Sequence, residues 1–184
     1  MWQDFLSYWD SLWRDIPLYV FESLGVVFCI GTVVLFALKG FKGGWRYVSG
    51  LLLAEYIFVL YCSTVIFRHV ASKRSYDFSP FWSYRSYFRG EDTTLLGENI
   101  MNVLVFVPVG LLLGLSSRSM TLLWALLIGV CLSVGIETLQ LIFLRGFSEF
   151  DDVMHNSLGC VMGYGVYLIG RYGYERIIRV HASW

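Results

Sequence analysis

The segment MTLLWALLIGVCLSVGIETLQLIFLRGFSEFDDVMHNSLGCVMGYGVYLIG, residues 120–170, decides the fold, because a short polar link joins two apolar stretches. Each stretch approaches the length of about 20 residues that a helix needs to cross a bilayer. The first carries Glu137 and Gln140, and the second carries Asp152 and Asn156. A carboxylate inside lipid is costly and usually marks the working site of a membrane protein. We therefore expect the function to reside in this hairpin.

The composition extends this interpretation to the whole chain. The 184 residues are 57% hydrophobic and 15% charged, with a mean hydropathy of +0.60. A soluble domain carries about 25% charged residues. The sequence predicts an all-α integral membrane protein with about five transmembrane helices, at residues 17–38, 47–67, 99–115, 120–144 and 153–170. Residues 17–184 would form a single transmembrane domain.

Two segments outside the predicted spans suit the membrane interface. In residues 1–16, tryptophan and aliphatic residues recur at three- and four-residue spacing, which predicts an amphipathic interfacial helix. Residues 68–98 mix basic and aromatic residues, as is typical of a long loop at the interface. Basic side chains in this loop could bind an anionic headgroup or phosphate.

Small residues within the spans predict where helices approach one another closely. Gly110 and Gly114 form a pair of small residues four positions apart, and Gly159 and Gly163 form another. Such pairs let helix backbones approach each other in a membrane. They could serve either contacts within the protein or the surface of an oligomer or partner complex.

The charge pattern excludes one class of partner but does not settle the orientation. The net charge is zero and no basic stripe is present, so we expect no nucleic-acid partner. The expected partner is the lipid bilayer. Five spans would bring loop 68–98, the late part of the fourth span and the start of the fifth to one membrane surface. Lys and Arg are equally numerous on the two sides. We place the N-terminus outside and the C-terminus in the cytoplasm, on the functional grounds given below.

The polar residues near that surface form the candidate site. Glu137 and Gln140 are three residues apart and Asp152 and Asn156 are four apart, so each pair projects from one helix face. Arg145, in the link, could bind one carboxylate through two parallel hydrogen bonds. We expect a ligand-binding site formed by Arg68, Asn102, Glu137, Gln140, Arg145, Asp151, Asp152 and Asn156.

The same residues allow other interpretations. A fully hydrogen-bonded network could be only a structural lock, and Asp151 could be a helix N-cap. In an enzyme, Glu137 and Asp152 would form an acid–base pair, one protonated and one ionised. No Ser or Cys nucleophile with a paired base is evident. Asp151 and His155 at four-residue spacing are weak as a metal motif, so we expect neither a metal nor a cofactor.

An ordered set of motifs resembles the VanZ-like family. The motifs are YCSTVIFR (61–68), YDFSPF (76–81), NIMNVLVFVPVGLLLG (99–114), GIETLQ (135–140) and RGFSEFDDVMHNSLGCVMGY (145–164). The resemblance covers about residues 47–170, in order and at suitable spacing. Glu149 stands where the family usually has Asp, and His155 stands where an aliphatic residue is usual.

The resemblance implies a multi-pass protein of the bacterial cell membrane. Its named member gives low-level resistance to the glycopeptide teicoplanin, which carries a fatty acyl chain and acts on envelope precursors outside the cell. The family pattern implies importance for Arg68, Pro80, Asn102, Pro108, Glu137, Gln140, Arg145, Asp152 and Asn156.

Three hypotheses follow for the function. In the first, a polar cavity in the outer leaflet binds an envelope component, such as a lipid-linked cell-wall precursor or the glycopeptide antibiotic. In the second, the protein is an intramembrane enzyme that modifies a lipid-linked envelope substrate. In the third, it is a structural or partner-binding subunit that packs through Gly159 and Gly163, and an oligomer is possible.

Overall fold

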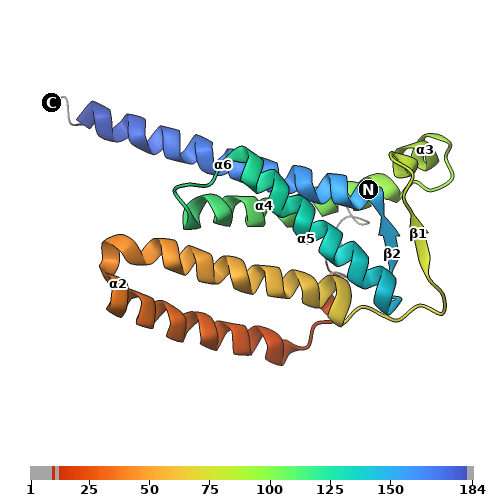
Figure 1. Ribbon diagram of the computed structural model, residues 1–184, viewed down its shortest axis with the longest axis horizontal. Helices are drawn as coiled ribbons and strands as arrows, with labels where there is room; N and C mark the ends of the chain where they lie inside the picture. Colours follow the sequence, from red (N-terminus) through yellow and green to blue (C-terminus); the bar gives the residue numbers. More distant parts are fainter. Residues whose placement is uncertain (1–9, 11–12, 182–184) are drawn as a thin grey trace.

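The structure, a computed structural model, describes residue 10 and residues 13–181, most of which are helical (Figure 1). The elements in chain order are α2 (Leu18–Tyr61), the π-helical turn η1 (Cys62–Ile66), β1 (Ser75–Asp77), α3 (Trp82–Phe88), α4 (Leu95–Ser116), α5 (Leu122–Phe143), β2 (Phe147–Glu149) and α6 (Phe150–His181). The predicted all-α class is confirmed.

Within the described part of the chain, four helical segments are long and apolar enough to cross a membrane. They are Leu18–Gly40, Gly43–Ile66, Leu95–Ser116 and Leu122–Phe143, and they match the first four predicted spans. The fifth predicted span lies inside α6, a helix of 32 residues that continues past the predicted end at residue 170. Acidic and amide residues in its first two turns make α6 less apolar than the other four.

The first two spans form a hairpin inside α2, with its turn at Gly40 (Figure 1). Gly40 has φ 69° and ψ 171°, a left-handed conformation that glycine adopts without the steric penalty of a Cβ. The first arm exposes large apolar side chains along its length, among them Leu18 and Leu38. A continuous apolar surface of this kind suits contact with lipid.

The core lies where α4 packs between α6 and the second arm of α2, while α5 covers α6 from another side. Its buried side chains include Leu60, Phe106, Val109 and Cys160. Gly110, Gly159 and Gly163 let the α4 and α6 backbones touch, since a Cβ on any of the three would overlap a carbonyl oxygen of the facing helix. The predicted close helix approach through these glycines is therefore confirmed, and it occurs within this chain.

The loop expected at residues 68–98 contains more regular structure than its sequence predicted. It includes β1, α3 and the first turn of α4, and β1 pairs in parallel with β2, with Tyr76 opposite Ser148. This pairing ties the loop to the link between α5 and α6. Figure 1 shows β1, β2 and α3 gathered at one end of the bundle, where α5 ends and α6 begins. The predicted convergence of these segments is confirmed.

The amphipathic helix expected at residues 1–16 lies mostly outside the described residues. Arg14 donates to the Asp10 carboxylate. Ile16 is buried and packs in a small cluster with Val20 and Cys62.

Candidate functional site

Glu137 lies near the end of α5, where its side chain is only 6% exposed. Its Oε2 accepts a hydrogen bond of 2.9 Å from the backbone N–H of Glu149, and the Ser148 side chain is a second partner. Glu137 thus holds the β2 segment against the end of α5.

Asp152 and Asn156 face other helices from the first turns of α6. One Asp152 oxygen accepts a hydrogen bond of 2.6 Å from the Asn102 amide on α4. One turn later, the Asn156 amide donates to the Ser133 hydroxyl on α5 at 2.8 Å. The predicted approach of Asn102, Glu137 and Asp152 is found, since the charge of Glu137 also acts on Asp152.

Arg68 supplies positive charge to this acidic cluster. Its guanidinium lies against Gly146, where a Cβ would stand 2.7 Å from the Arg68 Cζ atom. Gly146 has φ 121°, in the region that glycine alone adopts readily. The charge of Arg68 acts on both Glu137 and Asp152, while its own side chain is largely exposed. It is therefore available to a ligand.

Asp151 is 1% exposed, and its carboxylate holds the start of α3. It accepts hydrogen bonds from the backbone N–H of Phe81 at 2.6 Å and of Ser83 at 3.0 Å. The Ser83 hydroxyl donates to it at 2.6 Å and accepts from the Asn99 amide at 3.1 Å. One interpretation of the sequence makes Asp151 the N-cap of its own helix. In the structure its carboxylate instead binds the N–H groups at the start of α3, which have no helical acceptors.

Gln140 and Arg145 bind the end of the second span. The Gln140 amide donates to the Thr64 carbonyl at 3.1 Å, and Arg145 donates to the carbonyls of Ile66 and Arg68, both at 2.6 Å. Carbonyls at a helix end need such donors. The expected bond between Arg145 and a carboxylate is wrong, since no ion pair joins them within the described residues.

Glu149 belongs to the site although it was not among the candidates. It is 9% exposed, and the Trp82 indole N–H donates to its Oε2 at 2.9 Å. Burial raises the pKa of Glu149 to about 7; the Trp82 hydrogen bond opposes this rise and the charge of Glu137 adds to it. The sequence held one signal, three acidic residues within five positions directly before the last span.

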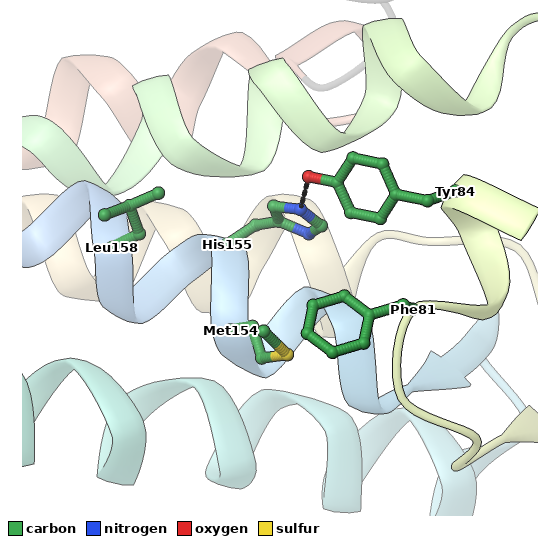
Figure 2. A pocket seen from close by; sticks show the side chains of 5 residues that line it. All are labelled: Phe81, Tyr84, Met154, His155 and Leu158. Atoms are coloured by element: carbon green, nitrogen blue, oxygen red, sulfur yellow. Dashed lines mark hydrogen bonds between the residues drawn. The ribbon is translucent and has the colours of Figure 1, made fainter.

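A pocket of about 440 Å³ lies beside this cluster, between α3 and α6. Figure 2 shows the side chains that line it, which are Phe81, Tyr84, Met154, His155 and Leu158. The Tyr84 hydroxyl lies 2.7 Å from His155 Nε2. This pocket could not be predicted from the sequence, because its two walls are about seventy residues apart in the chain.

The chemistry available to the cluster is proton binding and charge recognition. The charge of Arg68 acts on Glu137 and Asp152, and Glu149 adds a third buried carboxyl group, so negative charge is in surplus within the cluster. Within residue 10 and residues 13–181, no three His, Cys, Asp or Glu side chains are arranged to hold a metal ion.

These features define a class: an α-helical membrane protein with a buried acidic cluster and an exposed arginine at one end of its bundle. A family model described as VanZ/LLP1 matches residues 51–171, more than half of the chain. The chain belongs to the VanZ/LLP1 family, and the matched range includes all eight candidate residues.

One known protein is similar to part of this chain. The chain is 34% identical to Protein VanZ of Enterococcus faecium over 70 residues, which are 38% of this chain and 44% of that protein. The chain thus spans less than half the length of this relative. No solved structure matches the chain.

Proposed function

We propose that this VanZ-like protein binds an amphiphilic component of the bacterial cell envelope at the end of the bundle that holds Arg68 and the acidic cluster. By doing so it lowers susceptibility to lipoglycopeptide antibiotics such as teicoplanin. The observation that carries the proposal is the combination of an exposed arginine, buried carboxylates and exposed apolar helix faces at one end of the bundle. An amphiphile needs both a polar and an apolar contact.

The hydrogen bonds within the cluster and the exposed Arg68 support binding of an anionic headgroup. The oxygens of Glu137 and Asp152 already accept hydrogen bonds from Glu149 and Asn102. Arg68 is the group that a phosphate or carboxylate would meet first, and its planar guanidinium suits both anions. The lipid part would then lie along the apolar faces of the helices.

The test replaces Arg68 and compares it with a matched arginine. The protein is produced in a teicoplanin-susceptible bacterium, and the minimal inhibitory concentration is measured together with the membrane yield. Arg68→Gln is expected to abolish the protection, whereas Arg171→Gln, which changes an exposed arginine on the distal part of α6, is expected to preserve it. Full protection by the Arg68→Gln protein at normal yield would refute the proposed site.

The proposal requires the acidic cluster to face outward, which places the N-terminus outside and the C-terminus in the cytoplasm. A membrane-impermeant maleimide can measure this in intact cells, with single cysteines in an otherwise cysteine-free chain. Ser72→Cys lies in the exposed part of the loop after η1, and Ser119→Cys is exposed in the turn between α4 and α5. We expect labelling at position 72 and none at 119, and the reverse pattern would rule out an outer-leaflet site.

A second candidate, an intramembrane enzyme acting on a lipid-linked envelope substrate, is favoured by one observation. Glu137, Glu149 and Asp152 lie close enough for their charges to interact, as an acid–base pair requires. Glu137→Gln is nearly isosteric and keeps an oxygen for the Glu149 N–H. If protection survives this change, acid–base catalysis by Glu137 is excluded and binding is favoured.

A further inference from the structure

The pocket between α3 and α6 combines an apolar lining with one polar ring (Figure 2). Its volume of about 440 Å³ lies within the range of ligand sites in proteins. Met154 and Leu158, one turn apart on α6, are 37% and 50% exposed, so the pocket is open along the outer face of this helix. In a membrane-embedded bundle, that face is accessible to lipid.

His155 places an unused polar atom in this pocket. Its side chain is 7% exposed, and its Nε2 is bound to Tyr84. The other ring nitrogen, Nδ1, is buried and makes no hydrogen bond of acceptable geometry. Figure 2 shows this nitrogen on the side of the ring toward Phe81. A buried polar atom without a partner is costly, which favours a ligand that supplies one.

The surroundings of the imidazole determine which group can be that partner. Asp151 acts on the ring through both its charge and its backbone, and burial of the ring favours the neutral imidazole. In the tautomer in which Tyr84 donates to Nε2, the neutral ring carries its proton on Nδ1, which becomes a donor. The partner must therefore be an acceptor. An anionic acceptor would be repelled by the Asp151 carboxylate, so an uncharged carbonyl fits best.

We propose that this pocket binds an ester-linked fatty acyl chain of a membrane glycerolipid. The chain lies against Phe81, Met154 and Leu158, and His155 Nδ1–H donates a hydrogen bond to the ester carbonyl. An isoprenoid chain offers no carbonyl at this position and would leave the donor without a partner.

This inference does not depend on the function proposed above. The lipid site uses α3, Met154, His155 and Leu158, whereas the proposed headgroup contact uses Arg68, which does not line the pocket. Loss of lipid binding with intact teicoplanin protection would overturn only the lipid site. Loss of protection in the Arg68→Gln protein, with intact lipid binding, would concern only the headgroup site.

The experiment uses the full chain in detergent micelles with a phosphatidylcholine that carries a photoreactive diazirine on its acyl chain. An otherwise identical ether-linked lipid, which lacks the carbonyl, serves as the matched probe. Cross-links are located by mass spectrometry of proteolytic peptides. We expect the ester lipid to label the segment containing Met154 and Leu158 about three to ten times more strongly than the ether lipid, the range for one hydrogen bond.

Two variants separate the carbonyl contact from the apolar contact. His155→Leu is expected to lower labelling by the ester lipid to the level of the ether lipid. Leu158→Trp fills the pocket and is expected to lower labelling by both lipids, whereas Leu168→Trp, farther along α6, leaves both unchanged. Equal labelling of the native protein by the two lipids would overturn the carbonyl contact. Equal labelling of the two tryptophan variants would overturn the pocket.

A measurement on the native protein keeps the proposal testable if a variant fails to fold. The ¹⁵N NMR signals of the His155 imidazole report which nitrogen carries the proton and whether it donates a hydrogen bond. The ester lipid is expected to shift the Nδ1 signal, and the ether lipid is not. An unprotonated Nδ1 in the lipid-bound protein would contradict the proposal.

Discussion

Replacing Gly159 with alanine tests the close contact between α4 and α6 that positions the whole site. At Gly159 an added Cβ would overlap the Val103 carbonyl oxygen and would stand 2.9 Å from both the Val103 carbonyl carbon and the Phe106 Cβ atom. Non-bonded carbon atoms rest about 3.5–4.0 Å apart. The carbonyl oxygen is closer than these carbon atoms, so the two helices must separate by roughly 1 Å or more at this level.

The expected destabilisation follows from that separation. A gap of about 0.5–1 Å removes a quarter to a half of the attraction between facing atoms. Inserting one methyl group into a packed core costs about 1–3 kcal/mol, and the better helix propensity of alanine returns at most about 1 kcal/mol. We expect a net loss of about 1–2 kcal/mol in the free energy of unfolding, which lowers the Tm by roughly 2–8 °C in a chain of this size.

The assay is thermal unfolding of the purified protein in detergent, followed by circular dichroism. Gly165→Ala is the matched control on the same helix, since a Cβ there would meet nothing within 4 Å. It is expected to leave the Tm unchanged or to raise it slightly, because alanine favours the helix. If Gly159→Ala is as stable as Gly165→Ala, the α4–α6 contact described here is wrong.

Three further predictions concern the end of the bundle that holds the site. Asp151→Asn removes the charged acceptor at the start of α3 and should lower the free energy of unfolding by about 1.5–3 kcal/mol. The expected readouts are a lower Tm and faster proteolysis near α3. Arg145→Gln removes the donor to two carbonyls and should speed cleavage between η1 and β1 in limited proteolysis. The pKa of Glu149 is about 7 in the folded protein, against an ordinary value of 4.5 in the unfolded chain. Between these pH values the unfolded chain releases the proton and the folded protein keeps it, so the free energy of unfolding should fall as the pH rises. Glu149→Gln should flatten this pH dependence.

Each of these results has a specific contrary outcome. A Tm unchanged by Asp151→Asn would mean that α3 does not depend on the charge of that carboxylate. Unaltered proteolysis of the Arg145→Gln protein would mean that water replaces the guanidinium at the carbonyls. A pH profile that is the same for the native protein and the Glu149→Gln protein would show that another group carries the titration.

The spans could be predicted from the sequence because apolar length is a local property. The first four are apolar runs, and the structure places helices at all four. The fifth was expected to be of the same kind, but α6 begins with the polar residues that build the site and is less apolar for that reason. The β1–β2 pair could not be predicted, since two strands of three residues carry almost no pattern.

The candidate site was predictable to the extent that helix periodicity determines it. Asn102, Glu137 and Asp152 meet because each lies on the inner face of its helix near the same end of the bundle. The partners of Arg145 were not predictable, because backbone carbonyls are present at every residue and leave no mark in the sequence. Glu149 was missed because a strand, rather than a helix, turns it inward.

The first turn of α6 explains why the pocket and the acidic cluster occur together. Asp151 and Asp152 are adjacent, and neighbouring residues of a helix point in directions about 100° apart. One carboxylate therefore holds α3, which forms a wall of the pocket, while the other faces Asn102 and the remaining acidic groups. A substitution that unwinds this turn would disturb both sites at once. Changes at Arg68 and Leu158, which lie outside the turn, are consequently the ones that can separate the proposed headgroup recognition from the proposed binding of an acyl chain.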